Sequence, residues 1–287
     1  MLITKARDAQ GFVLVAVIWM AGLLAVMATA FALTARSHSL VVRNVVWNSK
    51  AEYVADAVVR LKVFDLATLG IGNGAKLNGE TTFCQWAPDV VAGFRIQDQA
   101  GLVDLNLASP ELLAAVFGAL SVSSEGVRPL MNMMQDYRDP DTQGTDGGTE
   151  PSNYPTKKHG PKNAPFIMAE ELGQLPLFDD ALLNKALPLF TVYSQQPGFD
   201  PKFAPEQLLK LLAASGASLD HFTAASPSKI FAIDALVKSK QGATFYRQAI
   251  IALILQPDRP FAILEWKHGQ DAGDWVFPAV AQSSCFN

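Results

Sequence analysis

The longest apolar run of the chain covers residues 12–35, and neither a charged residue nor a proline interrupts it. About 20 apolar residues, each rising about 1.5 Å, cross the hydrocarbon core of a bilayer as one helix. A cleaved secretory signal has a shorter apolar region, of roughly 7–15 residues, followed by a small-residue cleavage site. The length of this run therefore predicts a membrane-spanning helix rather than a secretory signal peptide.

The helical pattern continues beyond the apolar run. No Pro or Gly occurs between Thr34 and Leu69, and apolar residues recur there at near-helical spacing. These residues are Val42, Val45, Val46, Ala51, Val54, Ala55, Val58, Leu61 and Leu66. Glycines at positions 70, 72 and 74 then predict the end of the helix. We interpret residues 12–70 as one long helix; the alternative is a membrane anchor followed by a separate core helix.

A short polar segment, residues 1–11, precedes the apolar run, and the change from polar to apolar falls sharply between Gly11 and Phe12. Lys5 and Arg7 lie before the span, and three further Lys or Arg residues lie just after it. Because basic residues flank the span on both sides, the positive-inside rule assigns no orientation.

The remainder of the chain alternates between strand-like and helix-like stretches. The candidate strands cover residues 81–86, 93–96, 231–233, 244–255 and 260–266. Between the second and third of them the pattern is helical, with helix starts at Ser109-Pro110-Glu111 and Ala204-Pro205-Glu206. This order predicts an α+β fold, in which the long N-terminal helix packs on a small antiparallel sheet and an α-helical domain is inserted into the sheet domain.

Charge and motif content argue against nucleic acid and against catalysis. The formal net charge is -4, and residues 104–215 alone hold 8 Lys+Arg and 14 Asp+Glu, whereas phosphate contacts need the opposite sign. The four histidines are scattered, and neither H-E-x-x-H nor G-x-S-x-G occurs. We therefore predict a protein that is not an enzyme and that has protein partners rather than nucleic acid.

Two cysteines, Cys84 and Cys285, lie near opposite ends of the part that follows the long helix. They do not form a C-x-x-C pair, which argues against a zinc or thioredoxin-like site. In an oxidising compartment they could form one disulfide. Two unpaired thiols are an equal alternative, because the sequence does not show whether the two Cα atoms come close.

An acidic, glycine-rich stretch covers residues 136–150. Its carboxylates are Asp136, Asp139, Asp141, Asp146 and Glu150. Hard cations such as calcium take roughly six to eight oxygen ligands from loops of this kind. The spacing does not match an EF-hand, and no histidine lies among the carboxylates. The stretch is a candidate structural cation site; the alternative is a solvated acidic loop.

The start of the chain resembles the type IV pilin and type II secretion pseudopilin family. The residues that carry the resemblance are the short basic leader ending in Gly11, the aromatic Phe12 and the long apolar helix that follows. In that family a prepilin peptidase cuts after the glycine and methylates the new N-terminus, which implies cleavage after Gly11 and methylation of Phe12. The family usually has Glu at the fifth mature position, where this chain has Ala16.

The replacement at Ala16 has a physical consequence. A carboxylate in the apolar layer is costly unless it pairs with the N-terminal ammonium of the neighbouring subunit. A subunit with no neighbour above it has no such partner, and alanine avoids the unpaired charge. Ala16 therefore suggests a subunit at the tip of a filament.

The rest of the chain resembles one class within that family, the general secretion pathway protein K family. The resemblance lies in a helix start, L-N-x-A-[SP]-x-E-x-L; an acidic D-W-x-D-x-D stretch; a Gly-x-Glu followed by Tyr; a P-F-x-x-x-E-E-L segment; and a second Pro-Glu helix start. The matching residues here are 105–113, 136–141 with Tyr137 in place of Trp, Gly148 with Glu150 and Tyr154, 165–172, and 203–209. That class usually lacks the glutamate at mature position five, in agreement with Ala16.

The resemblance implies a non-catalytic minor pseudopilin at the tip of the type II secretion pseudopilus, which starts assembly with other minor pseudopilins and supports protein export. It implies a single-pass anchor in inner-membrane lipid, a periplasmic soluble part, processing by prepilin peptidase, and Ca²⁺ at Asp139, Asp141 and Glu150, to which we add Asp146 on its chemistry. The expected organisation is a leader at 1–11, a long helix at 12–70 with its span at 12–35, a β part at 71–104 and 217–287, and an inserted α-helical domain at 105–216. The alternatives are a bitopic inner-membrane protein with a periplasmic adaptor domain, and a minor pilin of a related type IV pilus system.

Overall fold

The structure is a computed structural model. It describes residues 8–69, 75–120, 124–141, 143–144, 161–216, 218–256, 258–268, 275–279, 281 and 283–286, with side chains at all of these except 8–11, 124, 125 and 255.

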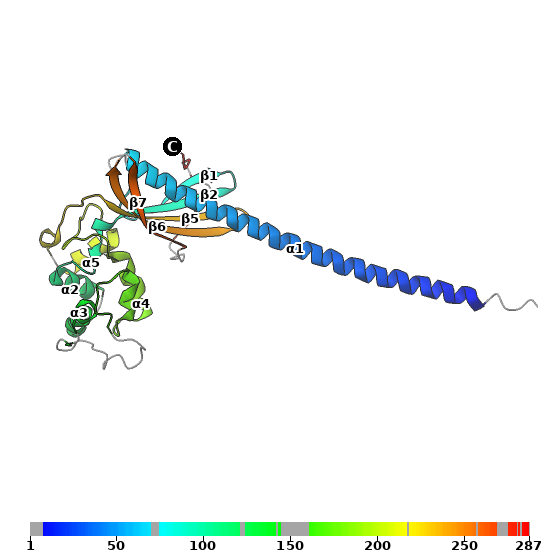
Figure 1. Ribbon diagram of the computed structural model, residues 1–287, viewed down its shortest axis with the longest axis horizontal. Helices are drawn as coiled ribbons and strands as arrows, with labels where there is room; N and C mark the ends of the chain where they lie inside the picture. Colours follow the sequence, from blue (N-terminus) through cyan, green and yellow to red (C-terminus); the bar gives the residue numbers. More distant parts are fainter. Residues whose placement is uncertain are drawn as a thin grey trace, which may run out of the picture.

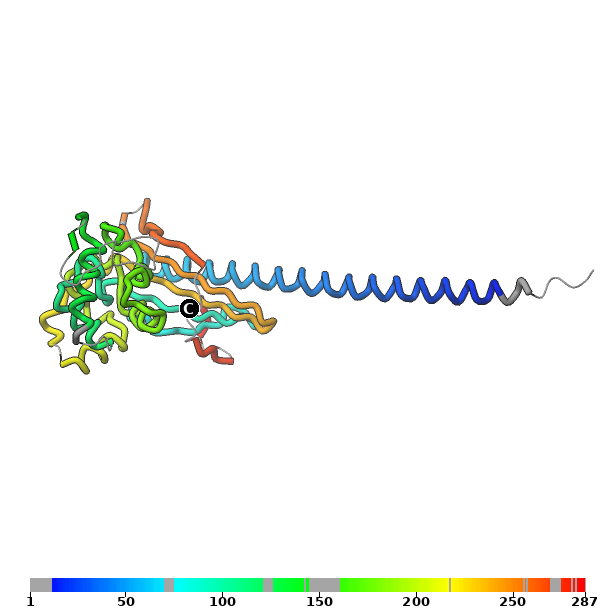
Figure 2. The backbone as a smooth tube through the Cα atoms, turned by 90° about the horizontal axis from the view of Figure 1, so that it is seen from below, coloured from blue at the N-terminus to red at the C-terminus, as the bar shows by residue number. Residues whose placement is uncertain are grey.

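The N-terminal helix α1 covers Asp8–Leu69, 62 residues in one continuous element. At about 1.5 Å per residue, this is a rod of about 90 Å. Its N-terminal half projects away from the rest of the molecule, and its C-terminal half lies along a sheet (Figures 1 and 2). The prediction of one long helix is confirmed, and the alternative of two separate helices is not. The helix begins at Asp8, inside the predicted leader, because a single Gly11 lowers helix stability by only about 1 kcal/mol.

Five strands form an antiparallel sheet in the order β1-β2-β5-β6-β7. The strands are β1 (Thr82–Ala87), β2 (Val90–Asp98), β5 (Ile230–Ser239), β6 (Thr244–Gln256) and β7 (Arg259–His268). Each was predicted from its β-prone composition, although β5 extends beyond the predicted residues 231–233. The α+β fold class is therefore confirmed.

The first hydrophobic core lies between the C-terminal half of α1 and one face of this sheet. Small and β-branched residues of α1, including Ala55, Val58 and Val59, are fully buried there. On β5 the alternate residues Phe231, Ile233, Ala235 and Val237 are fully buried in the same core. Side chains along a strand alternate between its two faces, so every second residue of β5 points toward α1. Along α1, the residues that point toward the sheet are three or four positions apart.

The chain leaves the sheet after β2 and returns to it at β5. The intervening segment holds α2 (Pro110–Ala119), α3 (Ser124–Arg138), η3 (Ala169–Gln174), α4 (Asp180–Ala186), η4 (Leu187–Leu189), α5 (Glu206–Ala214) and η5 (Leu219–Phe222). It also holds η1 (Gln99–Gly101) and the short parallel pair β3 (Val103–Asp104) and β4 (Phe190–Thr191). The sequence did not predict the β3–β4 pair, because two residues are too few to show a strand period.

The predicted helix starts differ in how they are capped. Ser109 caps α2 as expected, since its side chain accepts a hydrogen bond from the Leu112 amide and Pro110 takes the first helical position. At α5 the helix begins at Glu206, and Pro205 is the residue before it, without a side-chain cap. The second proline therefore ends the preceding extended segment instead of opening the helix.

A second core, separate from the first, fills the inserted segment. Its fully buried members include Phe117 of α2, Leu130 and Met134 of α3, and Leu208 of α5. This segment forms the end of the molecule that lies farthest from the N-terminus of α1 (Figures 1 and 2).

The junction between the two cores is polar and buried. Asp98 at the end of β2 accepts hydrogen bonds from the Ala100 amide and the Ser226 hydroxyl. Gly101 lies directly against Phe203, because a Cβ at this position would be 2.2 Å from the Phe203 carbonyl oxygen. Burial raises the pKa of Asp98, and its hydrogen bonds oppose the rise. The close approach of Gly101 to Phe203 fixes where the inserted segment leaves the sheet.

Candidate functional site

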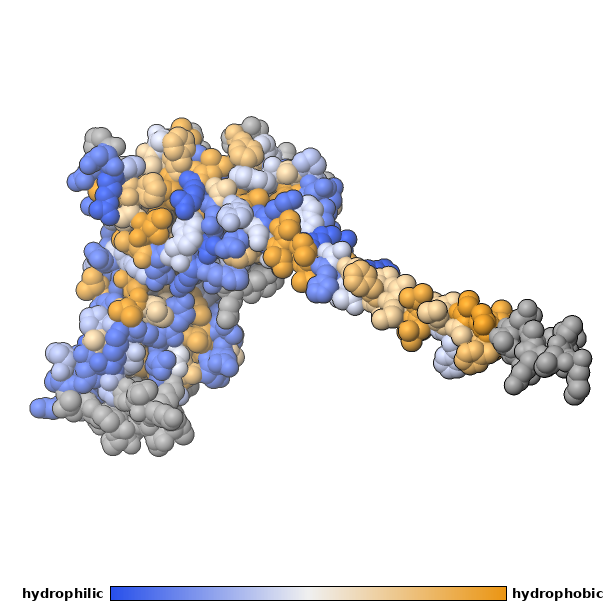
Figure 3. All heavy atoms as spheres, turned by 45° about the vertical axis from the view of Figure 1, so that its right-hand side comes forward, coloured by the Kyte–Doolittle hydropathy of each residue, from blue (hydrophilic) through white to orange (hydrophobic). Residues whose placement is uncertain are grey.

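The projecting half of α1 is an exposed apolar surface. Phe12 has 77% of its surface exposed, Phe31 has 79%, and Ala16 is also exposed. Apolar side chains cover this half of the helix, and polar ones gather nearer the sheet (Figure 3). Gly11 lies within the helix, at the start of this surface.

The apolar surface needs a partner other than water. A soluble monomer rarely exposes a contiguous apolar patch larger than a few hundred Å². Of the described helices, α1 alone is long and apolar enough to cross a membrane. Its projecting half therefore fits a single-pass membrane anchor, as predicted for residues 12–35.

Arg247 of β6 attaches the sheet to the other half of α1. Its Nε donates to Asp56 Oδ1 over 2.6 Å, and its Nη2 donates to Glu52 Oε1 over 3.1 Å. Its guanidinium also lies 5.4 Å from the ring of Trp266. The Arg247 side chain is only 8% exposed, whereas Glu52 is 46% and Asp56 25% exposed, so solvent screens the pair with Asp56 less than the pair with Glu52. This contact fixes the position of α1 along the sheet.

The face of α1 that points away from the sheet keeps large apolar side chains in the open. Tyr53 is 72% exposed, Phe64 is 60% exposed, and Val45 is 59% exposed. Scattered exposed apolar residues are ordinary, but these follow the same helix as the anchor. Exposed apolar side chains therefore also occur on the sheet-bound half, where they alternate with charged residues such as Arg60.

The acidic stretch begins at the end of α3, and the structure describes only part of it. Asp139 and Asp141 are described, whereas Asp146 and Glu150 lie outside the described residues. Asp141 Oδ1 accepts from the Gln143 amide over 2.8 Å, and its carbonyl oxygen accepts from Asn163 Nδ2 over 2.7 Å. Among the described residues, no group of three or more His, Cys, Asp or Glu side chains is arranged to hold a metal.

Asp139 nevertheless has the properties of a cation ligand. Its Oδ1 is buried, and no described residue gives it a hydrogen bond. Partial burial, followed by the charges of Asp141 and Asp136, raises the pKa of Asp139, while Arg138 opposes the rise. A buried carboxylate oxygen without a donor is stabilised by a cation, so this one atom agrees with the predicted cation site, which stays a prediction.

Residues from three of the motifs meet in one cluster, although they lie far apart in sequence. Asn106 exchanges two hydrogen bonds with the backbone of Phe166, at 2.9 and 2.8 Å. Tyr137 stacks on the ring of Phe166 at 4.7 Å, and its hydroxyl donates to Glu171 Oε2. Lys162 pairs with the other oxygen of Glu171 over 3.0 Å. The motifs therefore fix the packing of the inserted segment, next to the acidic stretch.

Cys84 and Cys285, whose pairing the sequence left open, are joined by a disulfide across a sequence separation of 201. Each is 2% exposed, and both lie in the core between α1 and the sheet. The bond ties the C-terminal residues to β1, the first strand of the sheet.

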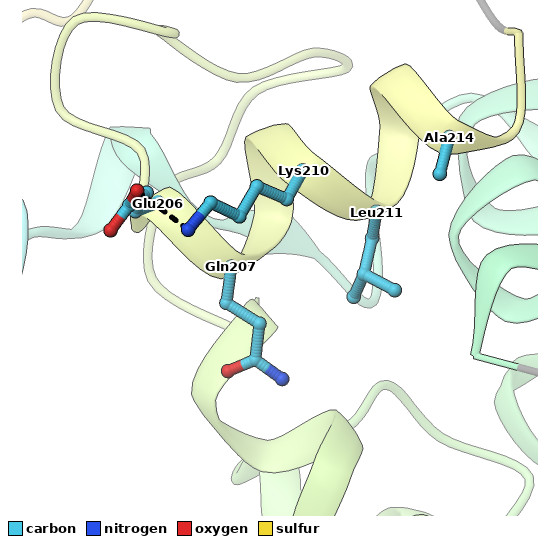
Figure 4. Close-up of a pocket in the computed structure, with 5 residues that line it drawn as sticks. All are labelled: Glu206, Gln207, Lys210, Leu211 and Ala214. Atoms are coloured by element: carbon cyan, nitrogen blue, oxygen red, sulfur yellow. Dashed lines mark ion pairs between the residues drawn. The ribbon is translucent and has the colours of Figure 1, made fainter.

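A shallow surface hollow of about 460 Å³ lies along α5 (Figure 4). All of its lining residues, Glu206, Gln207, Lys210, Leu211 and Ala214, come from that one helix. Glu206 and Lys210 form an ion pair there over 2.7 Å. This pair and its neighbours offer no nucleophile with an activating base, so the hollow does not support catalysis.

Sequence reasoning missed several residues that hold the molecule together. Arg247 stands in a strand that is otherwise largely apolar, and a lone charge there was a detectable sign of a buried ion pair. Its partners Glu52 and Asp56 were not detectable, because their separation from it exceeds 190 residues. Trp275, which packs on the far face of the sheet, gave no periodic signal.

The molecule is thus an α+β protein whose long helix has an exposed apolar half that fits a membrane anchor, a half that packs on the sheet, and an inserted helical segment beyond the sheet. Residues 96–195, about a third of the chain, match the family model of Type II secretion system (T2SS), protein K. This match covers the cluster of motif residues described above, from Asn106 to Glu171. The resemblance to protein K that the motifs predicted is confirmed over this segment.

The fold is also similar to that of a solved structure. The chain matches a chain of the GspK-GspI-GspJ complex from the enterotoxigenic Escherichia coli type 2 secretion system, with a TM-score of 0.57 and 15% sequence identity. The match covers 82% of this chain and 99% of that chain. At this identity the likeness concerns the fold alone. No curated protein matches the chain.

Proposed function

We propose that the protein is a non-catalytic minor pseudopilin of a type II secretion system, anchored in the inner membrane with its sheet and helical segment in the periplasm. The observation that carries this proposal is the shape of the molecule: an exposed apolar helix at one end and a bulky helical segment at the other (Figure 1). The helix packs among other subunits, and the bulk of the inserted segment prevents another subunit from stacking above it. The disulfide agrees with a periplasmic location, because such bonds persist in oxidising compartments.

The partners in this proposal are other minor pseudopilins at the filament tip. The similar fold comes from a complex with GspI and GspJ. The exposed apolar side chains of α1, among them Val45, Tyr53 and Phe64, offer contacts for their helices. Ala16 supports the tip position, since a terminal subunit has no neighbouring ammonium for a carboxylate there.

Processing by prepilin peptidase is the first test of the proposal. In membranes that contain the peptidase, intact mass and N-terminal sequencing should find a chain that starts at methylated Phe12. Gly11→Val should block the cut, because the peptidase recognises the glycine. Gly22→Val is the matched control: it lies in the same apolar helix with no atom within 4 Å of an added Cβ, and it should be cleaved normally.

A chain that still carries residues 1–11 would contradict the pseudopilin proposal and favour a bitopic membrane protein with an adaptor domain. Uniform incorporation along purified pseudopili would contradict the tip position. Deletion of the gene should abolish export by the secretion system. If a pilus were lost and export unchanged, the chain would belong to a related type IV pilus system.

We also propose a structural Ca²⁺ at the acidic stretch, held by Asp139 and Asp141 together with Asp146 and Glu150. The unpartnered buried Oδ1 of Asp139 supports this proposal. The cation would stabilise the turn after α3 by neutralising neighbouring carboxylates, and it takes no part in catalysis.

Thermal unfolding of the purified full chain tests the calcium proposal. At about 100 times the dissociation constant, Ca²⁺ should add about 2.7 kcal/mol to the free energy of unfolding, and EDTA should remove this gain. Asp139→Asn should abolish the calcium-dependent rise in Tm. Asp220→Asn, at an exposed carboxylate in η5, should leave it unchanged. An equal Tm in Ca²⁺ and EDTA would contradict the proposal.

A further inference from the structure

The outer edge of β1 is already occupied, and the occupant is the C-terminal part of the same chain. The Gln85 amide donates to the Ser283 carbonyl oxygen over 2.7 Å, and the Cys285 amide donates to the Gln85 carbonyl oxygen over 3.3 Å. Gln85 and Ser284 form a parallel β-bridge. An exposed edge strand presents unpaired amides and carbonyls to any extended chain. Here the C-terminal segment satisfies the amide and the carbonyl of Gln85.

We name residues 275–279, 281 and 283–286 the C-terminal strap. Its aromatic side chains hold it against the sheet. The Trp275 ring lies 4.2 Å from the Arg95 guanidinium, Phe277 packs on Phe83 at 5.1 Å, and Phe286 packs on Trp86 at 4.6 Å.

A glycine makes room for the largest of these anchors. A Cβ on Gly93 would lie 2.9 Å from Cε3 of Trp275 and 2.8 Å from Cε1 of Phe83. The strap and the sheet are therefore complementary in shape. Complementarity between an edge strand and an extended segment is what strand addition between chains requires.

Without the disulfide, the strap keeps only non-covalent contacts. Val276 is 84% exposed and Phe286 is 61% exposed, so much of the apolar surface of these two residues stays in water. Among the described residues, two backbone hydrogen bonds link the strap to β1, both at Gln85. Cys285, by contrast, is 2% exposed and covalently joined to Cys84 in the core. The disulfide is therefore the one covalent attachment of the strap to β1.

We propose that the Cys84–Cys285 disulfide is a redox-controlled lock on a strand-accepting edge, and that the reduced chain exchanges its C-terminal strap with a second copy of itself. A dithiol reductant supplies two electrons and two protons. The S–S bond breaks, Cys84 and Cys285 each become a thiol, and the reductant becomes a disulfide. The strap is then free to leave β1.

The strap of a second copy occupies the open edge of β1, because an identical strap can make the same contacts that the strap makes within one chain. Exchange of an identical element between copies forms no new kind of interface and is a low-cost route to dimers. Anchoring by α1 places the heads of two copies on the same side of a membrane, which raises their effective concentration. The inference does not depend on the pseudopilin proposal, since it rests on β1, the strap, the two cysteines and the apolar half of α1.

Hydrogen exchange of the full chain in detergent tests the release of the strap. On reduction the exchange rate of the Gln85 amide should rise at least about tenfold, while amides in β5 keep their protection. Unchanged protection at Gln85 would overturn the proposal, because the strap would stay bound without the lock. Loss of protection throughout the sheet would also overturn it, because the disulfide would then be a general stabiliser.

Reoxidation of mixed copies tests the identity of the occupant. Equal amounts of ¹⁴N- and ¹⁵N-labelled chain are reduced, mixed in detergent at high concentration, reoxidised and digested. Mass spectrometry should find mixed-isotope peptides that join Cys84 to Cys285. Trp275→Ala should raise their fraction by loosening the strap, whereas Val276→Ala, at a largely exposed residue, should not. Same-isotope peptides alone would show that each strap returns to its own chain, and would overturn the second-copy assignment.

Discussion

The two halves of α1 belong to one helix, yet their composition and their surroundings are opposite. In the projecting half, Phe12 and Phe31 are more than three-quarters exposed. In the sheet-bound half, Ala55, Val58 and Val59 are fully buried against the sheet. What differs is the periodicity: the projecting half is apolar all round, and the sheet-bound half has one apolar face and one polar face. A helix that is apolar on every face requires an apolar environment on every side, whereas an amphipathic helix requires a folded partner for its one apolar face.

The comparison also explains the residue sizes along α1. Where the helix meets the sheet, it presents alanine and valine, which let the helix axis approach the strands closely. Where it projects, large side chains such as Trp19, Met20 and Phe31 stand among alanines and valines, because no fixed surface has to match them.

The largest expected effect comes from a charge placed in the buried stripe. Val58→Asp puts an unpaired carboxylate into the core between α1 and the sheet, and should lower the free energy of unfolding by about 4 kcal/mol. Val42→Asp, at a residue 60% exposed on the same helix, should change it by about 0.5 kcal/mol or less. Urea unfolding of the full chain in detergent, followed by tryptophan fluorescence, measures both. Equal effects of the two substitutions would show that α1 does not contribute one face to the core.

A smaller effect is expected from the ion pairs that hold α1 on the sheet. Arg247→Met keeps the length and apolar stem of the side chain but leaves Asp56 and Glu52 without their partner. Because both carboxylates remain partly exposed, the loss should be about 2 kcal/mol, below that for a fully buried pair. Lys240→Met removes an exposed pair with Asp89 and should change stability by less than about 0.5 kcal/mol. A loss at Arg247 no larger than at Lys240 would mean that packing alone places α1.

Local sequence patterns predicted the helices and strands well, because each of these elements produces its periodic pattern within a few residues. The 3.6-residue spacing from Val42 onward and the alternation in the later strands are of this kind. The two cores were not predictable, since they depend on which face of α1 meets which face of β5. The β3–β4 pair escaped for another reason: it joins residues more than 80 positions apart, and each strand is two residues long.

The candidate site was likewise predictable only where a local pattern in the sequence indicates it. The apolar anchor and the change at Gly11–Phe12 were visible in the sequence, because hydrophobicity alone identifies them. The meeting of Asn106 with Phe166, across 60 residues, was not. Motif matching found both residues without revealing that they touch, and the structure supplies the reason why they occur together.

The smallest expected effect lies at the start of the projecting half. Ala16→Glu places a carboxylate near the end of the apolar surface, where water and lipid headgroups are within reach of a side chain that extends toward them. If the chain sits at a filament tip, the carboxylate has no ammonium to pair with, and export should stay within about twofold of the parent. Ala25→Glu is the matched control: it lies deep within the same apolar run, where insertion scales give a cost of about 2.5–3.5 kcal/mol for a charged residue, and membrane insertion should fall clearly. Export assays and membrane fractionation measure the two outcomes. A clear gain of assembly with Ala16→Glu would mean that a neighbouring ammonium is available to the carboxylate, and the chain would then have a neighbour above it and a place in the shaft.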